Sequence, residues 1–256
     1  MKSDAPSHFD GIASQYATSE VHSGSPTIRR LLELLAPKPP VSVCDLACGP
    51  GHLALAFAGR AGRIVGVDAA PNMLREFEKL AAGRGVTVET VHAWAETVPF
   101  PDQTFDIVVS RLAPHHFPDA AKAVREMARL TKSGGRVAVI DLEGHADPVA
   151  DALNHDIEVL HDASHGRSYT VARWRELFEA SGLVIEALEP KQSELPSGLS
   201  VRRWCEQGST PPAAEAAIRA RLAAAPPEQL AALGIRYENG EFYQPVRTLL
   251  ILGRKG

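Results

Sequence analysis

The sequence predicts an α/β protein with a mostly parallel sheet, and two neighbouring features carry this prediction. Residues 41–45 form a short, Val-rich apolar run after a proline pair, which is typical of a buried parallel strand. The run ends in Asp45, and a Gly-Pro-Gly turn at 49–51 leads into the helical stretch 53–58. A Gly-rich turn between the first strand and the first helix of a doubly wound sheet is where nucleotides bind.

Length and composition fit one globular domain. The chain has 256 residues, 45% of them hydrophobic and 23% charged, with a net charge of −4. It has no long basic block, so a nucleic-acid partner is not expected. Three cysteines without a disulfide pattern favour a reducing cytoplasm. Residues 1–6 lack the apolar core of a signal peptide, and no apolar run is long enough for a membrane span, so we expect neither.

The glycine turn by itself leaves two classes of ligand open. Its spacing, Gly49-x-Gly51-x-x-Ala54, also fits the looser dinucleotide-binding pattern of a nicotinamide-dependent oxidoreductase. Asp45 argues against that alternative, because a carboxylate four residues before the first glycine would face a pyrophosphate anion. The same carboxylate would attract a cationic ligand.

The stretch 45–51, D-L-A-C-G-P-G, resembles motif I of the class I S-adenosylmethionine-dependent methyltransferases. Three later stretches resemble the same family and follow in its order. S-adenosylmethionine carries an ammonium and a sulfonium and no phosphate, which agrees with the carboxylate of Asp45. The resemblance implies that this loop, including Ala47, Gly49 and Gly51, binds the cofactor.

The first forty residues are expected to form helices outside the sheet. Apolar residues from Phe9 to Tyr16 recur on one helical face, and Ser25-Pro26 supplies the start of a helix over 28–35. These helices could simply pack over the sheet. The F-D-x-x-A-x-x-Y pattern also resembles a helix that folds over the cofactor in small-molecule methyltransferases, which implies that Tyr16 lies near the cofactor.

Residues 62–68 are predicted as the second strand, which ends in another acid, Asp68. Asp68 follows Gly51 by 17 residues, close to the spacing at which a carboxylate holds the ribose hydroxyls of an adenosine ligand. Its alternative role is to cap the helix that continues to Ala82. The resemblance implies that Asp68 holds the ribose and that Ala69 and Met73 contact the cofactor, with Met73 at the adenine.

Residues 86–92 are the predicted third strand and 107–110 the fourth. The stretch between them, 93–106, begins A-W-A-E-T-V-P-F-P-D and resembles the family sequence G-D-A-E-x-L-P-F-P-D, whose first residues line the adenine. Trp94 departs from the Asp of many members. Because an indole only donates hydrogen bonds, Trp94 either stacks on adenine and leaves recognition to the Ala95 backbone, or is plain packing.

The stretch 110–119, S-R-L-A-P-H-H-F-P-D, follows the fourth strand at the sheet edge where ligands lie. Arg111, His115 and His116 are therefore expected at the crevice. The layout resembles the family near the methyl-donating sulfur, and histidine is suited to accept a proton near neutral pH. We expect one histidine, with a slight preference for His116, to face the site, and the other to bond a loop backbone.

The remaining core elements continue the alternation of helices and strands. A Gly-rich stop at 132–135 is expected after the next helix, and Asp141 is either a base or an ordinary polar residue at a strand end. The predicted elements are a helix over 120–130 capped by Asp119, a strand over 135–142, a helix over 170–181, a strand over 183–188 and a closing antiparallel strand over 245–252.

Two insertions are expected to determine the substrate. The first, 143–168, holds a helical run over 148–160 and then a polar loop. His155, His161 and His165 invite a metal interpretation, but their spacings of six and four residues do not suit one helix face that ends in a loop. A polar substrate pocket or a surface loop is favoured, and no metal site is expected.

The second insertion, 189–244, contains two Ala-rich helices bounded by proline pairs and a hairpin-turn signal at 238–241. We expect a lid or a dimer contact. Its candidate pocket residues, each of which could instead pack the lid on the body, are Arg202, Trp204, Tyr237, Phe242 and Tyr243.

The chain resembles the small-molecule group of class I methyltransferases that includes the ubiquinone and menaquinone biosynthesis enzymes. The resemblance implies a Rossmann-like, seven-stranded, mostly parallel sheet in the order 3-2-1-4-5-7-6, with helices on both faces and an α-helical lid between the last two strands. It implies one domain over 1–256, with lid helices at 1–40, a cofactor-binding core at 41–188 and 245–256, and the helical insertion at 189–244.

The implied function is in-line transfer of a methyl group from S-adenosylmethionine to a small molecule, with His116 or His115 as the base if the acceptor needs one. An S-adenosylmethionine binder that transfers no methyl group stays open beside the oxidoreductase alternative, and a homodimer is one option. The expected cofactor contacts are Tyr16, Asp45, Ala47, Gly49, Gly51, Asp68, Ala69, Met73, Trp94, Ala95 and Arg111.

Overall fold

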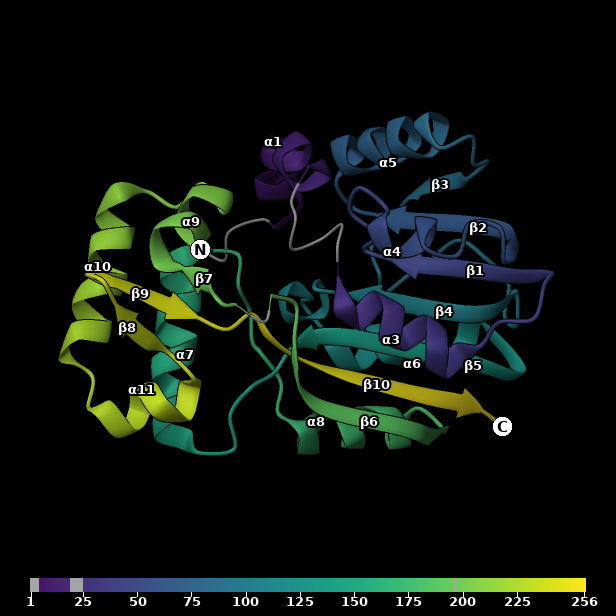
Figure 1. Cartoon of the computed structure of the whole chain (residues 1–256). Coiled ribbons are helices and arrows are strands. Elements are labelled where there is room, and N and C mark those ends of the chain that lie inside the picture. The colour runs from purple at the N-terminus through teal and green to yellow at the C-terminus, as the bar shows by residue number, and fades with distance from the viewer. Residues whose placement is uncertain (1–4, 19–24, 196) are drawn as a thin grey trace.

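The computed structural model describes residues 5–18, 25–195 and 197–256, so residues 1–4, on which most of the expectation about a signal peptide rests, lie outside the described part. Its main sheet has seven strands in the order β3-β2-β1-β4-β5-β10-β6 (Figure 1). Neighbours from β3 to β5 are parallel, and β10 is antiparallel to both β5 and β6, which confirms the predicted order. The strands are Val41–Leu46 (β1), Ala61–Asp68 (β2), Glu89–His92 (β3), Phe105–Arg111 (β4), Thr131–Leu142 (β5), Leu183–Ser193 (β6) and Arg247–Lys255 (β10).

Helices cover both faces of the sheet because both faces are apolar. Val108 of β4 belongs to the core beneath one pair of helices, and its neighbour Val109 belongs to the core on the opposite face. Ser25 and Asp119 cap their helices as predicted, accepting from the backbone N–H groups of Ile28 and Lys122. One face carries α6 (Ala120–Leu130) and α8 (Val171–Ala180), and the other carries α3 (Pro26–Leu35), α4 (His52–Leu55) and α5 (Pro71–Gly83).

Two boundaries differ from the sequence-based expectation. The helix expected over 53–58 ends at Leu55, because the next amides bond to carbonyls three residues back and form tight turns. The stop expected at 132–135 lies inside β5 rather than before it. Between Phe105↔Thr131 and Ile107↔Arg136 the register advances by 107 − 105 = 2 residues on β4 and by 136 − 131 = 5 on β5, so 132–135 bulges from the strand.

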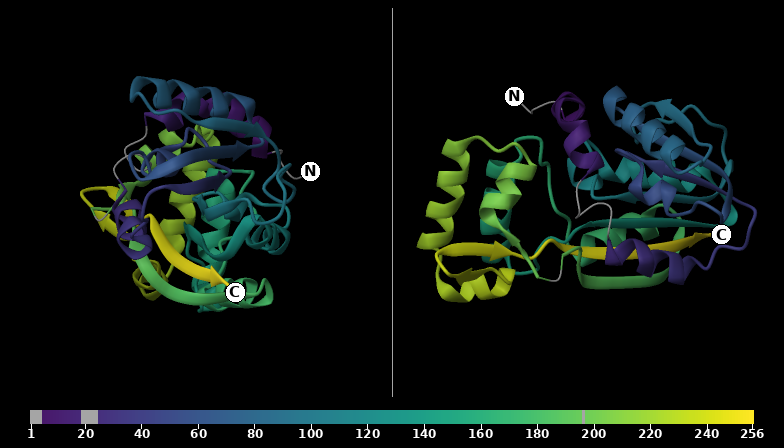
Figure 2. Two further views of the ribbon diagram at one scale, coloured as in Figure 1. Left: turned by 90° about the vertical axis from the view of Figure 1, so that its right-hand side faces the viewer. Right: turned by 45° about the horizontal axis from the view of Figure 1, so that its top comes forward.

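The two insertions form one body beyond the carboxyl ends of the parallel strands (Figures 1 and 2). Ile157, Trp204 and Leu222, from three different helices, share a core separate from those of the main sheet. A small sheet in the order β7-β9-β8 completes this body. Its elements are α7 (Pro148–His161), β7 (Leu199–Ser200), α9 (Val201–Gln207), α10 (Pro212–Ala224), α11 (Pro227–Leu233), β8 (Arg236–Glu238) and β9 (Glu241–Gln244).

The N-terminal helix α1 (Ala5–Ala17) lies between α5 and the insertion body (Figures 1 and 2). Asp10 accepts hydrogen bonds from the backbone N–H and the side-chain amide of Asn72, which ties α1 to the start of α5. On its other side, the Ser209 hydroxyl donates to the Gln15 amide oxygen at 3.2 Å. None of the described helices is long and apolar enough to cross a bilayer.

Candidate active site

The side chain of Asp68 joins the loop after β1 to the loop after β2. The N–H of Gly49 donates to the Asp68 carboxylate at 2.8 Å, and the other oxygen of Asp68 accepts from the N–H of Ala70, also at 2.8 Å. Gly51 has a φ of +81°, and a Cβ added there would lie 1.9 Å from Phe77 Cδ2. Gly51, expected as a cofactor contact, therefore packs on Phe77 beneath the loop and does not line the cavity above it.

Two acids end neighbouring strands at this loop, and burial disfavours the charge of both. Burial raises the pKa of Asp45 to about 8, although the Ala54 N–H, which its carboxylate accepts at 3.0 Å, and the Arg111 guanidinium oppose the rise. Burial also raises the pKa of Asp68, against the backbone N–H groups that its carboxylate accepts. A cation in the cavity would stabilise the charged form of both carboxylates, whereas a phosphate would favour their neutral form.

A first cavity opens above these acids, at the carboxyl ends of β1, β2 and β4. Trp94 is 48% exposed at its edge, so it is not a core side chain. Ala47 and Leu112 in the cavity wall have φ values of +53° and +49°, and such backbone conformations in non-glycine residues cluster at functional sites. The lining includes the expected residues Tyr16, Asp45, Ala47, Gly49, Asp68, Ala69, Met73, Trp94, Ala95, Arg111 and His116.

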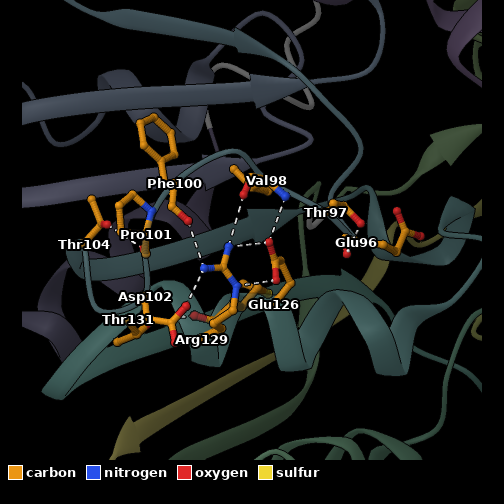
Figure 3. A network of polar contacts seen from close by, with 11 residues as sticks. Glu96, Thr97, Val98, Phe100, Pro101, Asp102, Thr104, Glu126, Arg129 and Thr131 are labelled. Carbon is orange, nitrogen blue, oxygen red and sulfur yellow. Dashed lines mark hydrogen bonds and ion pairs between the residues drawn. The ribbon is translucent and has the colours of Figure 1, made fainter.

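Side chains of α6 hold residues 98–102, in the stretch after β3 that resembles the family sequence. Arg129 of α6 donates to the carbonyls of Val98 at 3.1 Å and Phe100 at 2.9 Å, and to the Asp102 carboxylate at 2.7 Å (Figure 3). Glu126 accepts from the Val98 N–H at 2.8 Å and from Arg129 (Figure 3). The second half of this motif therefore positions the first half, which carries Trp94.

Arg111 enters the first cavity from the end of β4 and is held by a buried ion pair. Its guanidinium lies 2.9 Å from Glu194 Oε2, and both side chains are buried. Glu194 also accepts from the hydroxyls of Ser25 and Thr27 at 2.5 Å. Glu194 was not expected from the sequence, because it lies in the second insertion, 83 residues after Arg111.

The adjacent histidines have different environments. His115 Nδ1 lies 2.6 Å from the buried carboxylate of Asp141. Burial alone would lower the pKa of His115, but the charge and hydrogen bond of Asp141 raise it above its ordinary value. Since Asp141 accepts from Nδ1, the proton acceptor of a neutral His115 ring is Nε2, which no hydrogen bond engages in the described part of the chain.

His116 lines the first cavity and bonds the loop after α7. Its Nδ1 lies 3.3 Å from the Ser164 carbonyl oxygen, and its Nε2 lies 3.7 Å from Asp162 Oδ2. Burial, as the larger cause, and the nearby His115, as the smaller one, lower the pKa of His116 to about 3. The ring is therefore neutral near pH 7. The backbone contact expected for one histidine is thus made by His116.

A second cavity of about 320 Å³ lies on the other side of Tyr16, Leu112 and His116, which line both cavities. His115 lines the second cavity and not the first. Of the candidates expected from the second insertion, Trp204 lines it, whereas Arg202, Tyr237, Phe242 and Tyr243 do not.

Two acids of the second cavity, Glu158 and Asp162, were not predicted as site residues. The sequence pattern that could have identified Glu158 is a charged residue on the apolar face of a helix. Ala150, Ile157 and Glu158 are all buried residues of α7. Across the described ranges, no group of three or more His, Cys, Asp or Glu side chains is arranged to hold a metal ion.

Comparison with known proteins decides the family. A methyltransferase-domain model matches residues 44–139. The uncharacterized methyltransferase YcgJ of Bacillus subtilis is 32% identical over 212 residues, covering 82% of this chain and 81% of that protein. The chain belongs to the class I S-adenosylmethionine-dependent methyltransferases. Membership excludes the oxidoreductase alternative.

Other members of the methyltransferase family agree. The crystal structure of YcgJ has a TM-score of 0.81 and covers 89% of this chain and 97% of its own. A putative methyltransferase from Bacillus halodurans has a TM-score of 0.83 at 28% identity and covers 89% and 98%. A demethylmenaquinone methyltransferase of Thermus thermophilus is 39% identical over 115 residues, which is 44% of this chain and 52% of that enzyme.

The residues of the first cavity fit the cofactor of this methyltransferase family. Asp45 and Asp68 present carboxylates at two strand ends, which suits a ligand with an ammonium, a sulfonium and two ribose hydroxyls. Met73 and the half-exposed Trp94 offer apolar surface for an adenine ring. Asp45 would face the ammonium and Asp68 the ribose.

Proposed function

We propose that this methyltransferase binds S-adenosylmethionine in the first cavity and transfers its methyl group to a small molecule in the second. The observation that carries the proposal is the shared wall of Tyr16, Leu112 and His116, with the His115–Asp141 pair on the second side. Because these three residues line both cavities, a methyl group transferred across this wall passes from the first cavity into the second. The bound cofactor supplies an activated sulfonium methyl group.

We further propose His115, rather than His116, as the general base. Asp141 holds the tautomer in which His115 Nε2 accepts a proton, and the buried carboxylate stabilises the imidazolium that forms. The bound cofactor would supply the methyl group and keep the electron pair of the broken sulfur–carbon bond on its sulfur, while His115 Nε2 would take the proton that the acceptor atom loses. Orientation in a closed site can lower the barrier by about 7–11 kcal/mol.

The one-domain organisation over 1–256 belongs to the same proposal. In this proposal helix α1 and the insertion 189–244 act as lids, which is supported by Tyr16 and Trp204 lining the cavities from these two segments. The thiols of Cys44, Cys48 and Cys205 are free and buried, which supports the expected cytoplasmic location. The homodimer stays a prediction.

Calorimetric titration with S-adenosylmethionine, S-adenosylhomocysteine and NADH tests the cofactor. We expect micromolar binding of both adenosyl ligands, no binding of NADH, and a loss of about 100-fold in Asp68→Ala, which removes charge-assisted hydrogen bonds. Binding of NADH alone would refute the proposal. If the adenosyl ligands bind but no acceptor screen yields a methylated product, the protein is a binder without methyl transfer.

A further inference from the structure

The second cavity contains a carboxylate without a protein partner. Glu158 lies on α7, is 9% exposed and lines this cavity as well as a smaller one of about 60 Å³ behind it. In the described part of the chain, no hydrogen bond or ion pair reaches its carboxylate. Burial of a carboxylate that lacks a partner is costly, so a ligand that supplies the partner explains why the group is there.

The neighbouring acids Asp162 and Asp141 each have a hydrogen-bond partner within the protein. The Asp162 carboxylate accepts from the N–H and the hydroxyl of Ser164 at 2.7 Å, and it lies 3.7 Å from His116 and 3.9 Å from His8. Asp141 is paired with His115 behind the cavity wall. Glu158 differs from these two acids because no described residue donates a hydrogen bond to its carboxylate, so it is the acid for which a bound molecule would supply the missing partner.

Three of the four histidines that line the cavity do not supply cations near neutral pH. Burial lowers the pKa of His116 to about 3, of His161 to about 4 and of His165 to about 2. Arg203 contributes a cation to the lining, but its side chain is exposed. The fourth histidine, His115, has a pKa that Asp141 raises, and its charge is paired with that carboxylate. An anionic acceptor would therefore meet the Glu158 carboxylate, neutral imidazoles and a histidine whose charge is already paired.

One part of the cavity wall is apolar and includes a flat indole ring. Trp204 stacks on His161 with ring centroids 4.0 Å apart and an interplanar angle of 8°. Leu142, Leu199 and Val246 complete the apolar lining. A planar ring is suited to such a wall, with its polar end directed at Glu158.

We propose that the methyl acceptor is a small molecule with a planar apolar body and a protonated amine, and that Glu158 binds the amine. This inference rests on the proposed function, because it assigns the acceptor of the second cavity. Glu158 acts in recognition, and the nucleophilic atom lies at His115. The ion pair satisfies the buried carboxylate and orients the ring along Trp204.

The test uses matched probes that differ in one terminal group. The full-length protein, saturated with S-adenosylhomocysteine at pH 8, is titrated with tyramine, tyrosol and 4-hydroxyphenylacetate, and with the indole series tryptamine, tryptophol and indole-3-acetate. We expect the ammonium probe of at least one series to bind about tenfold or more tighter than its alcohol, and the carboxylate weakest. Glu158→Gln should remove this preference and leave alcohol binding within about threefold.

Controls separate recognition from misfolding. Glu206→Gln, an exposed acid on α9, should leave the preference unchanged, and S-adenosylhomocysteine affinity should be equal in wild type and Glu158→Gln. Burial raises the pKa of Glu158 to about 7, with Asp162 and Asp141 adding to the rise and His115 opposing it. The ammonium preference should therefore weaken at pH 6, where Glu158 is protonated.

Several outcomes would overturn the inference. They are equal binding within both series, preference for a carboxylate, an ammonium preference that survives in Glu158→Gln, and absence of ammonium binding by a protein that binds S-adenosylhomocysteine. Failure to bind S-adenosylhomocysteine itself would instead refute the proposed function, so the two failures are distinguishable.

Discussion

The two cavities share a wall but are built in different ways. The first is assembled mainly from turns at the ends of β1, β2 and β4, where a backbone N–H such as that of Gly49 is fixed by the side chain of Asp68. The second joins the end of β5, α7, α9 and Val246 just before β10, and its polar groups are side chains such as Glu158 and His115. A site made of strand-end turns is set by the fold, whereas a site made of side chains from inserted helices can change without altering the sheet.

The largest expected effect concerns the second cavity. His115→Ala and Asp141→Asn should each lower the rate of methyl transfer by about 10²–10⁴-fold, because they remove the proton acceptor or its tautomer control. Affinity for S-adenosylhomocysteine should change little, since His115 does not line the first cavity. The measurement is the single-turnover rate across pH, with the acceptor found by screening.

His116→Ala is the matched comparison for the proposed base. His116 lines both cavities, so we expect its loss to weaken ligand binding while the pH profile of the rate is retained. Full turnover in both His115→Ala and His116→Ala would show that the reaction uses neither histidine as a base.

The second prediction concerns the backbone of the first cavity. Gly51→Ala should reduce the free energy of unfolding by about 3 kcal/mol or more, because the new methyl group overlaps Phe77 and the residue has positive φ. Gly59→Ala is the control: its φ is +74°, but no atom lies within 4 Å of the added Cβ. We expect the control to lose about 1 kcal/mol in urea denaturation. Equal losses would mean that the contact with Phe77 is unimportant.

The same contrast explains what the sequence could predict. The sheet order was implied by the family resemblance, whereas the first cavity follows from local patterns, since Asp45, Asp68 and Trp94 each lie in a short segment whose turn fixes where they point. Gly51 shows the limit within such a motif, because its partner Phe77 is 26 residues away (77 − 51 = 26). A glycine needed for packing has the same local pattern as one needed for a ligand.

The second cavity could not be predicted in this way. Glu158 and Trp204 come together through packing of α7 on α9 and α10, which no local pattern specifies. The pairing of His115 with Asp141 joins residues 26 apart on neighbouring elements. Sequence alone therefore placed both histidines at the crevice but could not distinguish their partners.

The third prediction concerns the charge of the first cavity. Because the pKa of Asp45 is raised to about 8, a cation that pairs with its carboxylate must displace a proton at lower pH. The affinity for S-adenosylmethionine should rise about tenfold per pH unit from about pH 6 to 8 and then level off. Asp45→Asn should bind weakly with no such slope in calorimetry.

For the ligand-free protein the sign is the reverse. Folded Asp45 keeps its proton up to about pH 8, whereas the ordinary value is 3.8, so the folded state binds more protons between these values. This group therefore lowers the free energy of unfolding as pH rises, by about 1.4 kcal/mol per unit.

For the cofactor affinity, a flat pH profile in the wild type would contradict the proposed contact between Asp45 and the ammonium of S-adenosylmethionine.

The smallest expected effect concerns the hydrogen bonds of Arg129, which hold the stretch that carries Trp94 at the first cavity. Arg129→Ala removes hydrogen bonds to the carbonyls of Val98 and Phe100 and leaves Glu126 without its ion pair, so we expect a loss of about 1–2 kcal/mol in the free energy of unfolding. Arg125→Ala, an exposed residue of the same helix, is the control and should be nearly neutral.

Ligand binding by Arg129→Ala then distinguishes the two cavities directly. Loosening of the stretch that carries Trp94 should weaken S-adenosylhomocysteine binding a few-fold, because that stretch lines the first cavity alone. Tyramine binding to the cofactor-saturated protein should be unchanged, since none of the residues labelled in Figure 3 comes from α7 or α9. A variant that weakened both ligands equally would show that the cavities are coupled through the sheet and are not independent parts of the site.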